Sequence, residues 1–434
     1  MRVVVKFGGT SVRTPARVRL AARNIAAIRA AGNEVLVVVS AMGDATNRLM
    51  RMGRRAWPEA PVDQNLLRLL ATGETATASL LAMALGAEGC PAQAVGFDHP
   101  DFPLVAMPGQ SDAQVLSAGK VNDLVEVRLD ERASRSRFAK GIDPMLTSGT
   151  IPVFPGFFVR DGEGHLVTLG RGGSDVSAFL VGRFCRADEV VIVTDVRGVL
   201  TADPRVVPDS AVVPEMDAAL MSAVAQRGAQ VLHPNALRYK PESVTARVVH
   251  FTALGKLSEG TRITGAATTI LSVHPRPLTL HLLFAKGISA RLGLLARLGE
   301  FTSRRGVAIH GLTSADTVIG LYVEESAGHS LTQALHNEFV GAGRDFEELV
   351  VTRNVAEVRL TNPAFVNTQG VIHVVSEAMH RAGLLIVEMV TSHADVVVYC
   401  QFDQAQKVHR VLAERLGIGN GSPASGGRSR KKRG

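Results

Sequence analysis

Thr168-Leu-Gly-Arg-Gly-Gly-Ser-Asp175 and Lys6-Phe-Gly-Gly-Thr-Ser11 are two glycine-rich segments from distant parts of the chain. Each is predicted to be a turn between a β-strand and an α-helix. Lys6–Ser11 is the first glycine-rich turn along the chain, and the short apolar run Arg2-Val-Val-Val5 that precedes it is typical of a buried strand. Thr14 and Pro15 follow it as an N-cap and a first helical residue, so a helix is expected to begin there.

Both turns have the features of an anion-binding site. Glycines let backbone N–H groups approach an anion closely, and the helix N-terminus adds partial positive charge. Lys6 and Arg171 each add a full positive charge. Neither segment matches the P-loop pattern or the G-x-G-x-x-G dinucleotide fingerprint. The pair predicts a phosphate donor and an anionic acceptor that face each other; the alternative is that either turn is purely structural, as is common in α/β proteins.

Residues 2–251 alternate between strand-like and helix-like patterns, which predicts an α/β fold with a mostly parallel sheet flanked by helices. In this class ligands bind beyond the carboxyl ends of the strands, where both turns lie. The predicted strands are Arg2–Lys6, Glu34–Ser40, Ile151–Val159, Glu189–Thr194 and Val244–His250. The predicted helices include Pro15–Ala30, Glu74–Leu85, Asp175–Cys185 and Asp217–Arg227.

The composition is that of a soluble globular protein in a reducing compartment. The 434 residues are enough for two or three domains, and 46% are hydrophobic and 20% charged. We expect no membrane span, because no run of about 18 apolar residues occurs. The N-terminus lacks the pattern of a signal peptide, and the three cysteines are odd in number and far apart, so a cytoplasmic location is predicted. The 13 histidines show no metal-ligand spacing, so no protein metal site is expected.

The net charge of +8 is concentrated in the last residues of the chain. Residues 428–433 contain five of the positive charges, and they follow a Gly/Ser/Pro-rich stretch that begins at Gly419. Such a stretch cannot bury enough apolar surface to become ordered, so a flexible basic tail is predicted over 419–434. The charge therefore does not indicate a specific nucleic-acid site.

Four motifs, in order and suitably spaced, resemble those of aspartate kinases in the amino-acid kinase family. They are KFGGTS at the N-terminus, TLGRGGSD in mid-chain, VTDVRGVLTADPR from Val193, and Gly228-Ala-Gln-Val-Leu-His-Pro234. The resemblance implies an amino-acid kinase fold over residues 1–265. It also implies phosphorylation of the side-chain carboxylate of L-aspartate by ATP, the first step toward lysine, threonine and methionine.

The resemblance assigns the amino acid to residues in three segments. Ser40-Ala-Met-Gly-Asp-Ala-Thr-Asn47 resembles the loop that helps bind aspartate, although a helix cap is the alternative for its polar residues. Thr72-Gly-Glu74 is predicted to open a helix, where a glutamate usually serves as a cap. The implied substrate-binding residues are Thr46, Glu74, Arg171 and Ser174. Glu74 would contact the ammonium group and Arg171 the α-carboxylate.

The nucleotide phosphates are assigned to the first glycine-rich turn. The backbone amides of Gly8 and Gly9 would hold the γ-phosphoryl oxygens, with Thr10 and Ser11 beside them. Lys6 would neutralise charge in the transition state, and Asp175 would orient that lysine. Positioning and charge neutralisation carry such a reaction. Mg²⁺ would be bound mainly by ATP and water.

The rest of the nucleotide is assigned to the strip after residue 193. Thr194 and Asp195 would lie near the base and ribose, and Arg205 near the phosphates. Leu200 stands where the family usually has tyrosine, and Gln230 where it usually has a phosphate-binding lysine. A neutral amide supplies no charge, so a loss of a few kcal/mol in transition-state stabilisation is expected unless Arg205 or Arg227 compensates.

The pattern changes from about Ala267, where two α+β units of the ferredoxin-like type are predicted. The expected elements are Pro275–Leu283, Ser289–Arg305, Val307–Leu312 and Thr317–Glu324, then Ala356–Leu360, Asn367–Ala382, Leu384–Thr391, Asp395–Gln401 and Asp403–Leu416. Leu312-Thr-Ser314 and Val390-Thr-Ser392 occupy matching places. Residues 266–418 thus resemble the paired ACT domains of aspartokinases, which implies a homodimer or larger homo-oligomer and lysine or threonine as effector. A pair that only dimerises is the alternative.

Two other functions remain open from the sequence. A kinase for another amino-acid carboxylate is favoured by residues 90–114, which are rich in proline and match the family least. A nucleotide- or amino-acid-sensing protein with little catalysis is favoured by Gln230.

Overall fold

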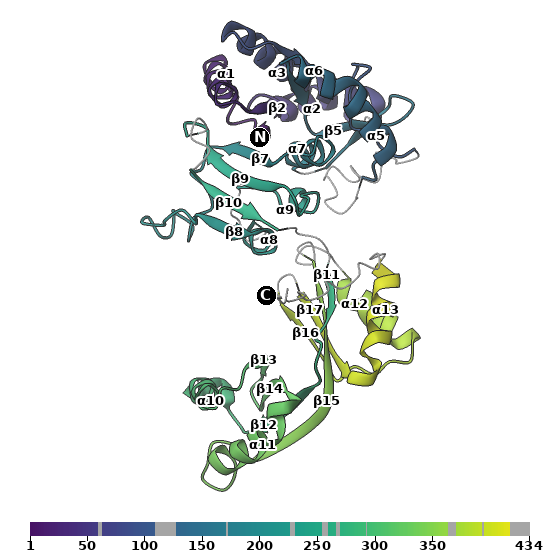
Figure 1. Ribbon diagram of the computed structural model, residues 1–434. Coiled ribbons are helices and arrows are strands. Elements are labelled where there is room, and N and C mark those ends of the chain that lie inside the picture. The colour runs from purple at the N-terminus through teal and green to yellow at the C-terminus, as the bar shows by residue number, and fades with distance from the viewer. Residues whose placement is uncertain are drawn as a thin grey trace, which may run out of the picture. The chain divides into compact units, whose positions relative to one another are not determined.

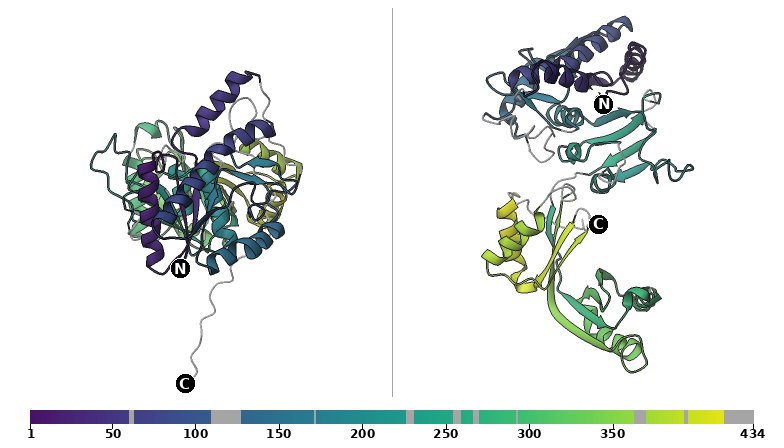
Figure 2. Two further views of the ribbon diagram at one scale, coloured as in Figure 1. Left: turned by 90° about the horizontal axis from the view of Figure 1, so that it is seen from above. Right: turned by 180° about the vertical axis from the view of Figure 1, so that it is seen from behind.

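The computed structural model describes residues 1–59, 63–108, 127–170, 172–225, 231–253, 259–265, 270–291, 293–362, 370–392 and 395–416. The chain separates into two compact units, Met1–Thr268 and Thr269–Gly434 (Figures 1 and 2). Each unit is described by itself.

The first unit is built on a mostly parallel sheet. Its strand order is β3-β4-β2-β1-β7-β9-β10-β8, and only the β9–β10 pair is antiparallel. These strands are β1 (Arg2–Phe7), β2 (Glu34–Val39), β3 (Ala92–Ala94), β4 (Ile151–Pro155), β7 (Glu189–Thr194), β8 (Glu215–Asp217), β9 (Thr245–His250) and β10 (Thr261–Thr264). The predicted α/β class is confirmed.

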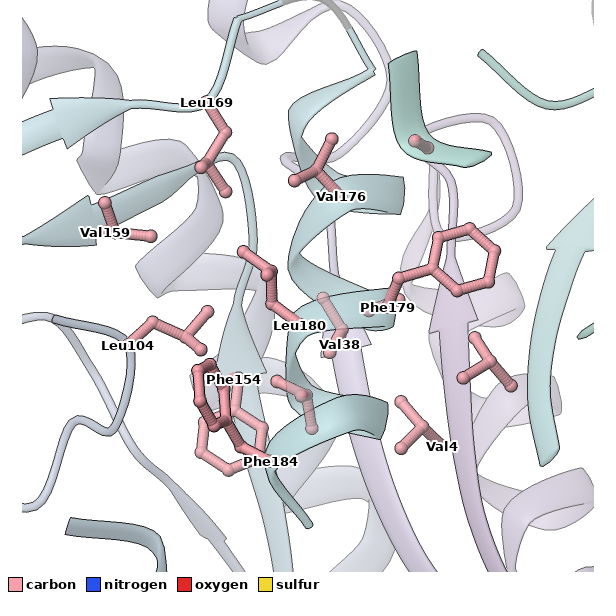
Figure 3. Packing of buried hydrophobic residues seen from close by; sticks show 14 of the residues in the cluster. Val4, Val38, Leu104, Phe154, Val159, Leu169, Val176, Phe179, Leu180 and Phe184 are labelled. Atoms are coloured by element: carbon pink, nitrogen blue, oxygen red, sulfur yellow. The ribbon is translucent and has the colours of Figure 1, made fainter. Parts of the chain in front are cut away.

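Helices cover both faces of this sheet. Side chains of a strand alternate between the two faces, so Val4 and Val38 pack in one core and Val5 and Val37 in the other. Figure 3 shows the first core, where Phe179 lies beside the strands. The helices are α1 (Pro15–Ala30), α2 (Ala45–Ala56), α3 (Gln64–Ala87), α5 (Glu131–Arg137), α6 (Asp143–Thr147), α7 (Gly173–Phe184), α8 (Ala218–Ala225) and α9 (Pro234–Leu237), with a π-helical turn at Phe138–Ile142.

Helix α1 begins and ends where the sequence predicted. The Thr14 hydroxyl accepts a hydrogen bond from the Arg17 amide (3.3 Å), and Pro15 occupies the first turn. Helix α3 instead begins far earlier than predicted, because Asp63 caps it by accepting from the Leu66 amide (2.9 Å). The expectation that Thr72–Glu74 opens this helix is therefore wrong.

Helix α3 is long and apolar enough to meet the criteria for a membrane span, which the search for an unbroken apolar run did not indicate. By length and composition it could cross a membrane, with a mean hydropathy of 1.3 over 18 residues. Several of its leucines lie in the two cores of the unit, Leu66 and Leu70 in one and Leu81 and Leu85 in the other.

The strand predicted over Ile151–Val159 is two strands. Strand β4 ends at Pro155, and β5 (Phe158–Arg160) forms a separate hairpin with β6 (Leu166–Thr168). Phe157 between them has a left-handed φ of 74°, which breaks the extended backbone. The short strands β8 and β10 were also missed.

The segment from residue 90, which matches the family least, contributes buried side chains to the core. Phe97 and Phe102 are buried, with ring centroids 5.1 Å apart in an edge-to-face arrangement. Residues 109–126, including the end of that segment, lie outside the described residues.

The second unit is an antiparallel sheet covered by helices. Its strand order is β13-β14-β12-β15-β17-β16, and β11 also pairs with β15. Its elements are β11 (Ile270–Val273), β12 (Leu278–Phe284), a 3₁₀ turn (Ile288–Ala290), α10 (Gly293–Arg304), β13 (Ile309–Ser314), β14 (Val318–Glu324), α11 (Glu325–Phe339), β15 (Glu348–Thr361), α12 (Val371–Arg381), β16 (Glu388–Ser392), β17 (Asp395–Gln401), a 3₁₀ turn (Phe402–Gln404) and α13 (Ala405–Leu416). Ser314 and Ser392 of the predicted repeat each end an edge strand.

The two halves of this sheet share strand β15 (Figure 1). Its first part pairs with β12 and its second part with β17, and Asn354 between them has a left-handed φ of 58°. Strand β11 precedes the first half in sequence but pairs with the second part of β15. The two α+β units are confirmed, but they are interleaved rather than consecutive. Helix α11 was not predicted, and the strand predicted at Ala356–Leu360 is only the end of β15.

Candidate functional site

The predicted site residues gather where parallel strands end. Lys6 is near the end of β1, Ser40 follows β2 and Thr194 ends β7, and these strands are neighbours or next neighbours in the sheet. The first turn of α7 carries Ser174 and Asp175. This is the edge at which α/β proteins bind ligands.

Lys6 and Asp175 form a buried ion pair. The Lys6 ammonium contacts Oδ1 of Asp175, and both residues are less than a tenth exposed. Asp175 lies in the first turn of α7, where the positive end of the helix dipole favours a carboxylate. The pair thus holds the lysine charge in one position at the carboxyl edge of the sheet.

Glu74 is a buried carboxyl in the middle of α3. It is 3% exposed, and its Oε1 accepts a hydrogen bond from the Thr46 hydroxyl over 3.3 Å. Burial raises the pKa of Glu74 to about 7, although hydrogen bonds from Thr46 and the Ala41 backbone oppose this rise. Among the described residues, its Oε2 has no hydrogen-bond partner. A buried acceptor of this kind is suited to a cationic donor of a ligand.

Ser40 and Ser174 join these two groups. Their hydroxyl oxygens are 2.8 Å apart. Ser40 precedes Ala41, whose backbone contacts Glu74, and Ser174 precedes Asp175, which pairs with Lys6. The sequence predicts Ser40 only as part of the loop 40–47 and not as a site residue. Its position directly after a buried strand is the signal that would have identified it.

The first glycine-rich turn is packed against the loop after β2. A Cβ at Gly9 would lie 2.7 Å from the Ala41 carbonyl oxygen, so glycine is required there. The Gly8 amide donates to the Val193 carbonyl over 3.3 Å, and the Ser11 hydroxyl donates to the same oxygen over 3.2 Å. The Gly8 N–H therefore already has a backbone partner, and its contact with phosphate stays a prediction. Thr10 is exposed at the tip of the turn.

The segment assigned to the rest of the nucleotide begins at the end of β7, the strand next to β1 in the sheet. The Thr194 hydroxyl donates to Asp195 Oδ1 over 3.2 Å. Arg205 is exposed and its guanidinium pairs with Asp203 over 2.7 Å, so this cation is held at the surface. Leu200 is partly buried in a short β-bridge. Arg171 and Gln230, the remaining two predicted site residues, lie outside the described residues.

The second and fourth motifs contact each other. Gly172 has a left-handed φ of 69° and caps α7, and a Cβ on it would lie 2.3 Å from the Cβ of His233. The loop that leads into α7 is therefore pressed against the segment that precedes α9.

Comparisons with known proteins agree with this geometry. The sequence profile of the amino acid kinase family matches residues 1–250. The aspartokinase of Pseudomonas aeruginosa is 36% identical over 249 residues, which is 57% of this chain and 55% of that protein. The aspartokinase of Thermus thermophilus is 28% identical over 421 residues, which is 94% of this chain and 97% of that protein.

Solved structures show the same fold. The aspartate kinase of Synechocystis superposes with a TM-score of 0.79 at 24% identity, covering 98% of this chain and 71% of that one. Aspartokinase III of E. coli, solved with aspartate and ADP, gives a TM-score of 0.50 at 22% identity, covering 96% of this chain and all of that one. Since the family profile spans more than half of the sequence, the chain belongs to the amino acid kinase family.

Proposed function

We propose that this protein is an aspartate kinase, which transfers the γ-phosphoryl group of ATP to the side-chain carboxylate of L-aspartate. The observation that carries the proposal is Oε2 of buried Glu74, which has no hydrogen-bond partner among the described residues. The loop beside Glu74 contains Ser40, which contacts Ser174, and Ser174 precedes Asp175 of the pair with Lys6. Relatives that cover nearly the whole chain are aspartokinases, and the E. coli enzyme binds aspartate and ADP, which supports the same substrates here.

The amino acid would be bound by its two ends. The ammonium group of the substrate would contact the carboxylate of Glu74. It would take the place of the proton that Glu74 tends to keep because burial raises the pKa of this carboxyl group. Thr46 orients Glu74, and Ser174 would contact the substrate from the first turn of α7. Arg171 would take the α-carboxylate through its guanidinium fork. This arrangement directs the side-chain carboxylate of aspartate toward the first glycine-rich turn.

The reaction itself needs charge neutralisation and alignment. A carboxylate oxygen of aspartate attacks the γ-phosphorus in line, the bond to the β,γ-bridging oxygen breaks, and ADP leaves. Lys6 neutralises charge on the transferring group, and Asp175 holds the lysine in place. The phosphates would be contacted by the backbone amides of Gly9 and Thr10 and by Ser11 of the same turn. The rest of the nucleotide would be contacted by Thr194, Asp195, Leu200, Arg205 and Gln230.

Magnesium fits this site as an ion that enters with ATP. The carboxylate of Asp175 already pairs with Lys6, which belongs to the glycine-rich turn. The residues therefore suit an ion bound mainly by phosphates and water, which shields the phosphate charge.

The C-terminal half of the chain would regulate the kinase. We assign residues 1–265 to catalysis, 266–418 to an ACT-like regulatory domain and 419–434 to a basic tail. Lysine or threonine would bind the regulatory domain of a homodimer or larger homo-oligomer. A cytoplasmic location accompanies this proposal, since Cys90, Cys185 and Cys400 are buried and unpaired.

The test is ADP release from MgATP by the purified full-length protein with L-aspartate, L-glutamate and other amino acids. Saturable turnover with aspartate, lost in Glu74→Gln at subsaturating aspartate, supports the proposal. Turnover with another acceptor alone would redirect the assignment to a different amino-acid carboxylate. Nucleotide binding without turnover on any acceptor would favour a sensor. A rate unaffected by lysine and threonine would exclude those effectors.

A further inference from the structure

Three side chains of types that can ligate a metal converge in the second unit, and none of them belongs to the proposed kinase site. They are His274, His310 and Glu324, and one ligand atom of each lies within 4.8 Å of the others. The Nε2 atom of His310 is 3.7 Å from Oε1 of Glu324, and the two imidazole rings are 4.6 Å apart between centroids. The residues come from three segments, so their spacing along the chain gives no metal motif.

The other contacts of these side chains leave the ligand atoms available. Nδ1 of His274 lies 2.9 Å from the Arg276 carbonyl oxygen and 3.4 Å from the Arg276 amide nitrogen. The shorter contact, to an oxygen that only accepts, favours the tautomer with the proton on Nδ1 and the lone pair on Nε2. Arg276 Nη1 donates to Oε2 of Glu324 over 2.7 Å, which leaves Oε1 facing His310. Metal-binding histidines and carboxylates are typically oriented by such outer contacts.

His310 supplies the sign that a partner is missing. Its Nε2 is buried and has no hydrogen-bond partner among the described residues, although Glu324 is near. A buried imidazole nitrogen without a partner costs free energy. A metal ion between the two side chains would satisfy this nitrogen.

We propose that His274, His310 and Glu324 bind a divalent transition-metal ion, with Zn²⁺ as the best fit. Two imidazole nitrogens and one carboxylate oxygen, with water in the fourth position, form a tetrahedral donor set suited to Zn²⁺. Metal–ligand distances near 2.1 Å place tetrahedral ligands about 3.4 Å apart. The 3.7 Å between His310 and Glu324 is close to that separation.

The ion would tie together the two halves of the second unit. His274 lies in the connection between β11, which pairs with the second part of β15, and β12, which pairs with the first part. His310 and Glu324 lie on β13 and β14 of the first half. Binding would therefore fix the connection at which the chain passes from one half to the other.

The chain also offers a control cluster. A second group of three potential metal ligands lies at an exposed turn of the first unit and consists of Asp161, Glu163 and His165. There, Oδ1 of Asp161 already accepts the backbone amides of Glu163 and His165 over 2.9 Å, as in an ordinary turn. This cluster carries no proposal, and His165→Asn serves as the matched histidine variant.

The experiment uses the full-length protein, stripped of metal with EDTA and dialysed, and titrated with Zn²⁺ in a calorimeter. We expect one site per chain in the wild type and in His165→Asn. Affinity should fall at least tenfold in His274→Ala and His310→Ala and should also fall in Glu324→Gln. Co²⁺ absorption bands of a four-coordinate nitrogen–oxygen site should appear in the wild type and be absent from the two alanine variants.

Thermal unfolding in EDTA checks that each variant is folded, and the Zn²⁺-induced rise in midpoint should be confined to the wild type and His165→Asn. Because His274 is partly exposed and on a connection, His274→Ala keeps the test valid if His310→Ala fails to fold. The proposal would be overturned by any of three results: Zn²⁺ affinity in His274→Ala equal to that of the wild type, loss of the Zn²⁺ site in His165→Asn, or no Zn²⁺ binding by the wild type.

Discussion

The ammonium group of Lys6, on strand β1, contacts the carboxylate of Asp175 in the first turn of helix α7. Both side chains are nearly excluded from water. Removing one member of a buried pair leaves the other charge uncompensated. The two glycine-rich motifs are therefore joined by an interaction whose loss affects both the fold and the proposed chemistry.

Replacing Lys6 by Met should lower kcat about 10²- to 10³-fold, because one preorganised cation is lost from the transition state. Asp175→Asn should lower kcat in the same direction, because the lysine is no longer held in place. Steady-state kinetics with MgATP and L-aspartate measure both effects.

The matched control is the buried pair of Arg247 and Glu189, whose atoms are 2.8 Å apart in the same sheet. Arg247→Met should lower the free energy of unfolding by about 3–5 kcal/mol. It should leave kcat of the folded enzyme unchanged. Equal losses of kcat in Arg247→Met and Lys6→Met would reduce the Lys6–Asp175 pair to a structural role.

Glu74→Gln should raise the KM for aspartate about 10- to 100-fold, since a hydrogen bond between charged groups contributes roughly 1.5–3 kcal/mol. The wild-type KM should fall as pH rises through about 7, because the ammonium group needs the ionised form of a carboxyl whose pKa is about 7. KM measured from pH 6 to 8 tests this, and a pH-independent KM would contradict it.

The same substitution should stabilise the protein at alkaline pH. The pKa of Glu74 is raised in the native state, so the native state holds its proton more tightly than the unfolded chain. Stability from this group is present below about pH 4 and is lost as pH rises through about 7. Glu74→Gln should therefore match the wild type near pH 4 and exceed it by up to about 3 kcal/mol at pH 8.

Chemical denaturation at the two pH values measures this difference. The control is Glu189→Gln, which removes the partner of Arg247 and should lower stability at both pH values while leaving KM unchanged. A Glu74→Gln protein less stable than the wild type at pH 8 would show that the carboxylate is compensated in solution.

The local part of the structure could be predicted from the sequence. Strand β1, the turn after it and helix α1 follow from an apolar run, two glycines and a Thr-Pro cap within a few residues. Lys6 and Asp175 were assigned to the site through motifs that resemble those of aspartate kinases, and the structure brings the two side chains into contact. Glu74 was assigned to the site, but its helix was misplaced, because the Asp63 cap that sets the start lies well before the apolar stretch used for prediction.

Contacts between distant segments could not be predicted. The residues of β11 do not show that this strand pairs with the end of β15 and not with β12, which follows it in the sequence. The choice of partner strand depends on tertiary packing. The Ser40–Ser174 contact and the cluster of His274, His310 and Glu324 likewise form only when separate strands assemble.

Gly172→Ala should lower activity at least tenfold. Its φ of 69° disfavours any side chain, and the added Cβ would lie 2.3 Å from His233, so the loop before α7 must move. Gly164 is the matched control, with φ of 89° and nothing within 4 Å of an added Cβ. Gly164→Ala should cost about 1 kcal/mol of stability and leave kcat unchanged. Equal kcat values in the two variants would exclude a role for the contact with His233.

Asn354 should be the position of β15 least tolerant of a β-branched residue. Its left-handed φ of 58° lies where the strand passes from β12 to β17, and asparagine and glycine adopt that conformation readily. Asn354→Val should therefore lower stability by about 1–2 kcal/mol, whereas Asn354→Gly should be nearly neutral. Thr352→Val, in the same strand but without positive φ, is the control. Urea denaturation of the full-length protein separates the three variants. A midpoint for Asn354→Val equal to that of Thr352→Val would mean that the strand passes between the two halves without a left-handed residue.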